Sequence, residues 1–164
     1  MTHKLNKWIL VTGMIRSGTT FVGRILSSPL QVDYIHEPFN TGYTIPDNQS
    51  FPRKYIPPNS PRSKEYRELI SHIFRYDFGL ATAYSDRDPW WRTLLKACVG
   101  SRGPFFLRLA KLNPMHRAAV VKDPLAALAA DYLYCHFDVR PVIVVRHPTA
   151  LAASLKRVDW WPEV

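Results

Sequence analysis

A short glycine-containing loop near the N-terminus constrains the fold of this chain more than any other segment. Residues 11–20 read VTGMIRSGTT, and four residues separate Gly13 from Gly18, as in a phosphate-binding loop (P-loop). Loops that bind nucleoside triphosphates have lysine directly after the second glycine, whereas this chain has Thr19 there and Arg16 inside the loop. The sequence therefore favours a ligand that carries a phosphate but no triphosphate.

The segments on either side of the loop predict the strand and the helix that such a loop connects. Residues 8–11 are apolar and rich in β-formers, and residues 19–27 place apolar side chains on one helical face. Backbone N–H groups and the start of this helix would hold an anionic group, with a permanent positive charge supplied by Arg16. A plain strand-to-helix turn that contains glycines by chance is the alternative.

Strands and helices alternate along the rest of the chain. Short, continuous, apolar segments predict fully buried strands at residues 118–121 and 139–145, and another strand is expected at residues 31–35. One helix is expected to begin at Ser60 and Pro61, and others at residues 90–99, 105–112, 125–137 and 149–157. Four aromatic residues on these helices are interpreted as core residues: Trp90, Trp91, Phe105 and Phe106. This order predicts one α/β, P-loop-like domain over residues 1–164, with a parallel sheet covered by helices on both faces and an irregular proline-rich loop at residues 38–62.

Charge and composition exclude several classes of protein. The chain has 22 Lys and Arg against 13 Asp and Glu, a net charge of +9, which favours an anionic partner. The basic residues are scattered, so no nucleic-acid-binding segment is expected, and no apolar run is long enough for a membrane span. Cys98 and Cys135 suit a reducing compartment, and neither they nor the histidines cluster as metal ligands. We expect a soluble, cytoplasmic protein without a metal site.

Four polar segments directly follow predicted strands. They are the loop at residues 13–20 and the tripeptides at residues 36–38 (His-Glu-Pro), 122–124 (Lys-Asp-Pro) and 146–148 (Arg-His-Pro). In an open parallel sheet, the carboxyl ends of the strands form the ligand crevice. The four segments should therefore converge on one edge of the sheet, which indicates an enzyme.

Together these motifs resemble those of sulfotransferases that use 3′-phosphoadenosine 5′-phosphosulfate (PAPS). The pattern is most similar to the Golgi-type carbohydrate and tyrosylprotein sulfotransferases and their bacterial relatives, whose Arg-Ser-Gly-Thr-Thr loop matches residues 16–20. In those families an arginine, and a serine eight residues later, bind the 3′-phosphate, and Arg146 and Ser154 have this spacing. The resemblance thus implies that the 5′-phosphosulfate is bound by Gly13, Arg16, Ser17, Gly18, Thr19 and Thr20, with PAPS as co-substrate and no metal.

The resemblance also implies catalytic roles. A glutamate after the second strand acts as general base in the tyrosylprotein enzymes, and Glu37 has the matching position; a simple pairing of Glu37 with a nearby arginine is the alternative. His36 is the competing base, because cytosolic sulfotransferases use histidine. Pro38 should hold Glu37 extended, so that only one of these neighbouring side chains faces the crevice. Lys122 would stabilise the leaving oxygen together with Arg16, unless it is merely a surface lysine, and Asp123 would cap the next helix.

These observations predict transfer of a sulfuryl group from PAPS to an acceptor hydroxyl or amine on a carbohydrate, lipid, tyrosine or small metabolite. A P-loop kinase acting on a small molecule and a non-catalytic module that binds nucleotides or polyanions are the alternatives. Tyr43, Arg53 and Tyr55 in the proline-rich loop are candidates for the acceptor wall. The resemblance extends over residues 8–157, and members of the family are longer. The C-terminal part of the family domain is therefore expected to be missing, leaving the nucleotide pocket open on one side.

Overall fold

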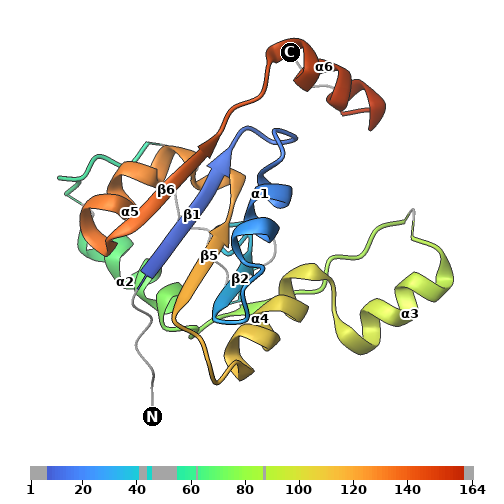
Figure 1. Ribbon diagram of the computed structural model, residues 1–164, viewed down its shortest axis with the longest axis horizontal. Helices are drawn as coiled ribbons and strands as arrows, with labels where there is room; N and C mark the ends of the chain where they lie inside the picture. Colours follow the sequence, from blue (N-terminus) through green and yellow to red (C-terminus); the bar gives the residue numbers. More distant parts are fainter. Residues whose placement is uncertain (1–6, 41–43, 46–54, 62, 87, 161–164) are drawn as a thin grey trace.

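A four-stranded parallel sheet forms the centre of the protein (Figure 1). The computed structural model describes residues 7–40, 44–45, 55–61, 63–86 and 88–160. The sheet has the strand order β2-β5-β1-β6, and the strands span Val32–His36 (β2), Ala118–Lys122 (β5), Lys7–Gly13 (β1) and Val139–Val144 (β6). A separate two-stranded antiparallel ribbon pairs β3 (Thr44–Ile45) with β4 (Gly79–Leu80).

Helices cover both faces of the sheet, which confirms the predicted α/β fold (Figure 1). Helices α1 (Thr19–Leu26) and α4 (Arg102–Leu112) lie on one face, and α2 (Ser63–Phe74) and α5 (Ala130–Phe137) lie on the other. A 3₁₀ helix, η1 (Pro124–Ala129), leads directly into α5, so that the predicted helix at residues 125–137 is real but begins with tighter turns.

The alternation of side chains along the strands divides the core between the two faces. On β1, Trp8 and Leu10 belong to the larger cluster that α2 and α5 cover, whereas Val11 packs with Tyr34 and Val120 toward α1 and α4. Both sets are needed because a parallel sheet buries both of its faces. Each fully buried aliphatic side chain contributes roughly 1.5–3 kcal/mol to folding.

The prediction of a strand at residues 139–145 is correct, but the prediction that this strand is fully buried is wrong. Strand β6 forms, but only Val139 is buried, whereas Ile143 is 63% exposed and Val145, just beyond the strand, is 86% exposed. The physical reason is position: β6 is the edge strand beside β1, and α6 (Pro148–Arg157) extends away from the sheet rather than covering it (Figure 1).

The two tryptophans of α3 (Trp90–Val99) are also not core residues. Trp90 is 79% exposed and Trp91 is 55% exposed, because α3 has no buried residue and lies apart from the sheet (Figure 1). Phe105 is likewise exposed, whereas Phe106 packs against the core on the α1 side of the sheet, with its ring 5.1 Å from that of Tyr34. Only Phe106 of the four aromatic residues therefore matches the prediction.

Candidate active site

The strand order places the four polar segments side by side along the carboxyl edge of the sheet. Glu37 follows β2, Lys122 ends β5, the glycine loop follows β1, and Arg146 follows β6. Neighbouring strands lie about 4.8 Å apart, so the four segments occupy roughly 15 Å of this edge. The expected convergence is confirmed, and the loop lies between the Glu37–Lys122 pair and Arg146.

The loop has the conformation that its two glycines permit. Gly13 has φ +142°, and a β-carbon there would collide with the carbonyl oxygen of Val144 on the neighbouring strand. Gly18 has φ +104° and immediately precedes α1, in open space. Any other residue would be strained at Gly18 and sterically excluded at Gly13, so both glycines are required by the backbone.

Hydroxyl groups of the loop remain available to a ligand. Thr19 and Thr20 begin α1, whose first-turn N–H groups favour an anion. Ser17 is 8% exposed, and its Oγ and the Oγ1 of Thr12 are buried without a hydrogen-bond partner in the part of the chain that the structure describes. Buried hydroxyls normally have a partner, and an anionic oxygen bound in the loop would provide one. Thr12 was missed by the sequence analysis, although it directly precedes Gly13.

At the β6 end, Arg16 of the loop comes together with Arg146 and Ser154, which lie 130 and 138 positions further along the chain. Nη1 of Arg146 donates to the carbonyl oxygen of Arg16 at 3.0 Å, and Nε of Arg16 donates to Oγ of Ser154 at 3.2 Å. Helix α6 brings Ser154 to this place: Pro148 lies in its first turn, and the side chain of His147 caps it by accepting from the N–H of Thr149. The predicted 3′-phosphate pair therefore lies in direct contact with the loop.

At the β2 end, Glu37 departs from its predicted conformation. Its φ is +51°, the left-handed region, rather than the extended conformation expected before Pro38. The N–H of Glu37 donates to the carbonyl oxygen of Lys122 at 2.8 Å, and the N–H of Phe39 donates to Oδ2 of Asp123 at 2.7 Å. These two bonds hold the chain in a turn whose strain is on the order of 1 kcal/mol.

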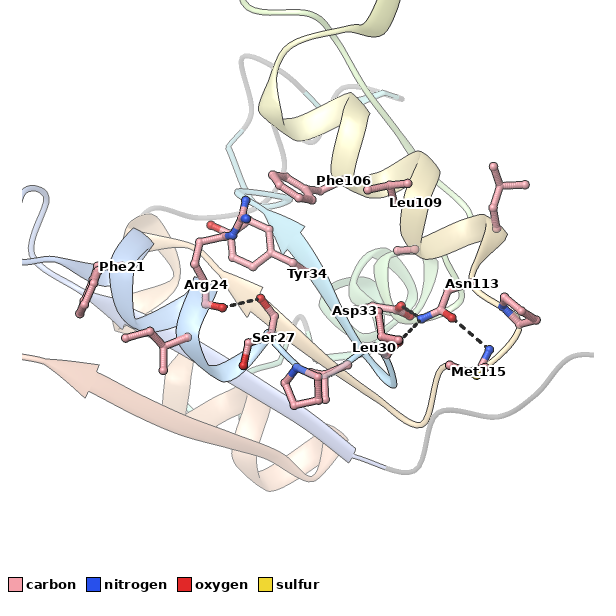
Figure 2. Close-up of a pocket in the computed structure, with 17 residues that line it drawn as sticks. Phe21, Arg24, Ser27, Leu30, Asp33, Tyr34, Phe106, Leu109, Asn113 and Met115 are labelled. Atoms are coloured by element: carbon pink, nitrogen blue, oxygen red, sulfur yellow. Dashed lines mark hydrogen bonds between the residues drawn. The ribbon is translucent and has the colours of Figure 1, made fainter.

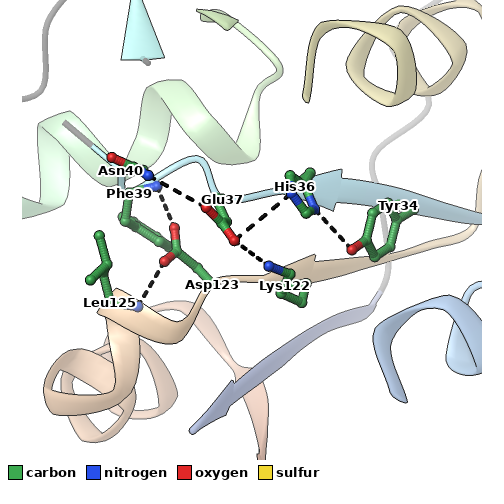
Figure 3. A network of polar contacts seen from close by, with 8 residues as sticks. All are labelled: Tyr34, His36, Glu37, Phe39, Asn40, Lys122, Asp123 and Leu125. Atoms are coloured by element: carbon green, nitrogen blue, oxygen red, sulfur yellow. Dashed lines mark hydrogen bonds and ion pairs between the residues drawn. The ribbon is translucent and has the colours of Figure 1, made fainter. Parts of the chain in front are cut away.

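This turn brings His36 and Glu37 to the same side, so the prediction that only one faces the crevice is wrong. Nε2 of His36 lies 3.8 Å from Oε1 of Glu37 (Figure 3). Both residues line one cavity. Nδ1 of His36 lies 3.0 Å from the hydroxyl of Tyr34. Burial raises the pKa of Tyr34 above its usual value, so the phenol stays protonated and can donate to Nδ1.

Lys122 is not a surface lysine. It is 2% exposed, and its ammonium forms an ion pair with Oε1 of Glu37 (Figure 3). Burial alone would raise the pKa of Glu37, but the hydrogen bond and the charge of Lys122 outweigh it and hold the pKa below its usual value. Glu37 is therefore ionised at neutral pH, as a general base must be, and its partner is this lysine rather than an arginine.

His36, in contrast, is neutral at physiological pH. Burial, with the positive charges of Lys122 and Arg102, lowers the pKa of His36 to about 4, although Glu37 acts in the opposite direction. An imidazole with so low a pKa is a weak base. The paired carboxylate of Glu37 also has a lowered pKa, so basicity alone does not separate the two candidates.

Asp123 anchors the whole β2 end of the site. It is completely buried, and its Oδ1 accepts from the N–H of Leu125 at 2.9 Å, which confirms the predicted helix cap. Its Oδ2 accepts from Phe39, the contact that the sequence did not reveal (Figure 3). Burial raises the pKa of Asp123 to about 7, against the two backbone hydrogen bonds and the charge of Lys122.

Two cavities lie near these groups. One of about 410 Å³ adjoins His36 and Glu37 and extends to α3 and to the start of α4. A larger one of about 910 Å³ lies between α1, α4 and the start of β2; there the guanidinium of Arg24 lies 4.4 Å above the ring of Phe106 (Figure 2). The larger cavity contains none of the predicted site residues, so the smaller one is the candidate acceptor site.

Of the three residues predicted for the acceptor wall, the structure describes Tyr55 alone. The hydroxyl of Tyr55 donates to Oδ2 of Asp131 on α5, at 3.4 Å, and Tyr55 does not line the cavity beside Glu37. Tyr43 and Arg53 lie outside the described residues.

Comparison of the chain with protein-family models, with curated proteins and with solved structures gives no match. Within the described residues, no helix has the length and apolar character needed to cross a membrane. The same part of the chain contains no group of three or more His, Cys, Asp or Glu that could hold a metal ion.

Proposed function

We propose that this protein transfers a sulfuryl group from PAPS to an acceptor hydroxyl or amine. The observation that carries the proposal is the arrangement of the carboxyl edge: an ionised glutamate paired with a buried lysine lies on one side of the glycine loop, and Arg146 and Ser154, both bonded to Arg16 of the loop, lie on the other. A donor with a 5′-phosphosulfate in the loop would place its 3′-phosphate at Arg146 and Ser154. Its sulfur would then face Glu37.

In this reaction the acceptor oxygen or nitrogen attacks sulfur while the bond between sulfur and the bridging phosphate oxygen breaks. The bonding electrons leave with 3′-phosphoadenosine 5′-phosphate (PAP), and the acceptor proton passes to Glu37. Negative charge develops on the leaving oxygen, where Arg16 and Lys122 would stabilise it without proton transfer. All atoms and electrons of the transfer are accounted for without an oxidant, a reductant or a metal.

The ion pair with Lys122 has a direct consequence for the base. While paired, Glu37 has a lowered pKa and is a weak base. Oxygens of a bound phosphosulfate would compete for the lysine ammonium, and Glu37 would become more basic as its partner turned toward the donor. The site would thus become reactive when the donor is bound.

The test is a measurement of labelled sulfuryl transfer from PAPS to a panel of hydroxyl and amine acceptors. Glu37→Gln should lower kcat by about 100- to 10,000-fold, as expected for a lost general base, and leave PAP affinity unchanged. Glu68→Gln, an exposed glutamate on α2, is the matched control and should keep full activity.

Three other results would point elsewhere. Full transfer by Glu37→Gln would remove Glu37 as the base. Magnesium-dependent phosphoryl transfer from ATP would favour a small-molecule kinase. Nucleotide binding with no transfer to any acceptor of the panel would favour a non-catalytic binding module.

A further inference from the structure

The cavity beside Glu37 has the dimensions and the walls of a small-molecule site. Its volume of about 410 Å³ lies within the range of roughly 300–1,000 Å³ that is usual for such sites. His36 and Glu37 line it at the end of β2, and Arg92 and Lys96 of α3 line another side. Arg102, the first residue of α4, also lines it. A cavity of this size holds one sugar ring or one aromatic ring with short substituents.

The negative charges of this cavity are already neutralised by neighbouring cations. Asp88 pairs with the ammonium of Lys96, which also donates to the carbonyl oxygen of Ala83 at 2.9 Å. Glu37 pairs with Lys122. Both pairs are largely shielded from solvent: the side chain of Asp88 is 8% exposed and that of Lys122 is 3% exposed.

Two arginines remain as excess positive charge. Arg102 lines the same cavity as His36 and Glu37, and it forms no ion pair and no hydrogen bond within the described residues. Arg92 is only loosely held: its Nη1 lies 3.9 Å from Asp88, and its side chain is 56% exposed. The cavity therefore carries more positive charge than its own acidic side chains neutralise.

We infer that the acceptor is a small hydroxyl or amine compound that carries a carboxylate, which Arg102 binds while the reacting group lies at Glu37. This inference rests on the proposed function, since it names the acceptor class of the same site. A planar guanidinium matches a carboxylate with two parallel hydrogen bonds, and Arg92 adds attraction from the α3 side. The carboxylate itself does not react: it orients the acceptor, and the same two arginines repel cationic acceptors.

The experiment compares pairs of similar acceptors, one with a carboxylate and the other with an ammonium or a hydroxymethyl group in its place. Transfer from labelled PAPS is measured with para-hydroxyphenylpropionate against tyramine, and with glucuronic acid against glucose. The wild-type protein should prefer each acid by about 10- to 100-fold in kcat/KM, the usual worth of a hydrogen-bonded charge pair. Arg102→Gln should lose this preference by slowing transfer to the acids, while transfer to neutral glucose stays unchanged and transfer to cationic tyramine becomes no slower.

Matched variants separate this role from general effects. Arg108→Gln, on the exposed surface of the same helix and outside the cavity, should keep the preference for acids. Arg102→Lys should keep part of it, because the charge remains and the two-pronged geometry is lost. Thermal unfolding of each variant verifies that the fold is intact.

Failure of the inference and failure of the proposed function have different signatures. Preferred transfer to tyramine and glucose, or an equal slowing by Arg102→Gln of transfer to the acids and to glucose, overturns the carboxylate site and leaves sulfuryl transfer standing. Binding of para-hydroxyphenylpropionate is also measured by calorimetry without PAPS. If it depends on Arg102 while no acceptor is ever sulfated, the carboxylate site stands and the proposed reaction falls.

Discussion

The two ends of the candidate site are built differently. At the β2–β5 end, Lys122 and Asp123 are buried, and each group is held by several bonds: Glu37 contacts Lys122, His36 and Asn40, and Asp123 accepts from two backbone N–H groups. At the β6 end, Arg16, Arg146 and Ser154 are linked by two hydrogen bonds, both exposed to solvent.

This difference follows from the position of the strands. Strand β5 lies between β2 and β1, so the residues at its carboxyl end are enclosed by neighbours, whereas β6 has a partner on one side only. The β2–β5 end is therefore held in place without any ligand. The β6 end could exchange an exposed bond, such as that between Arg16 and Ser154, for an oxygen of the proposed nucleotide at little cost.

The largest expected effect on stability lies at the buried end. Lys122→Met keeps much of the side-chain volume but leaves Glu37 without its partner. Losing one partner of a fully buried pair costs roughly 3–5 kcal/mol, and we expect about 2 kcal/mol because the side chain of Glu37 is 29% exposed. Urea unfolding measures this loss, and Arg146→Met should change stability by no more than about 0.5 kcal/mol.

A second substitution makes this test specific. The double variant Glu37→Gln, Lys122→Met removes both charges and should recover most of the stability lost by Lys122→Met alone. Equal losses of unfolding free energy in Lys122→Met and Arg146→Met would contradict this account of the two ends. So would a double variant that is no more stable than Lys122→Met.

At the exposed end, the effect should appear in binding rather than in stability. Arg146→Ala should weaken PAP binding by about 10- to 100-fold, because it removes the charged fork proposed for the 3′-phosphate, and leave AMP binding unchanged. Arg140→Ala provides the control, since Arg140 lies on β6, the strand that precedes Arg146, and pairs with Asp138 instead. Fluorescence competition measures both ligands, and equal losses for PAP and AMP would show that Arg146 does not read the 3′-phosphate.

A third prediction concerns the pH dependence of folding at the buried end. The pKa of Asp123 is raised to about 7 in the folded protein, above its value in the unfolded chain, so the folded state binds the proton more tightly. At about pH 4 this proton makes its full contribution to the free energy of unfolding. The contribution is lost as the pH rises toward 7, by at most about 1.4 kcal/mol per pH unit. Asp123→Asn should remove this slope from urea unfolding curves.

Asp131→Asn, an exposed carboxyl on α5, is the control for that experiment and should keep the slope. A stability profile that is unchanged by Asp123→Asn would mean that Asp123 stays ionised in the folded protein. Its two backbone hydrogen bonds would then dominate over burial.

The smallest effect is expected at His36. Its pKa is lowered to about 4, so it is neutral throughout the physiological range, and from its contacts we expect it to position Glu37 and Tyr34. His36→Gln should therefore lower kcat by less than about tenfold, far less than the loss expected for a general base. A loss as large as that of Glu37→Gln would exchange the roles of the two residues.

The parts of the fold that depend on local pattern were predictable. The apolar segment before Gly13 and the periodic one after Thr19 predicted β1 and α1, and the helix cap at Asp123 followed from the proline after it. The parallel order then placed Glu37, Lys122 and Arg146 on one edge, as expected.

What the sequence could not provide depends on contacts between distant residues. The left-handed conformation of Glu37 is fixed partly by a bond from Phe39 to Asp123, 84 positions away, which outweighs the local preference set by Pro38. The exposure of β6 was hidden because a β-branched edge strand has the same composition as a buried one. Trp90 was assigned to the core on hydrophobicity alone, yet the helix that carries it lies away from the sheet.

The central claim is that this edge of the sheet recognises a nucleotide with phosphates at both its 5′ and 3′ positions, and calorimetry with PAP and AMP tests it most directly. The account predicts that PAP binds at least about tenfold more tightly than AMP, because only PAP can engage Arg146 and Ser154. Equal affinities for the two nucleotides would contradict it.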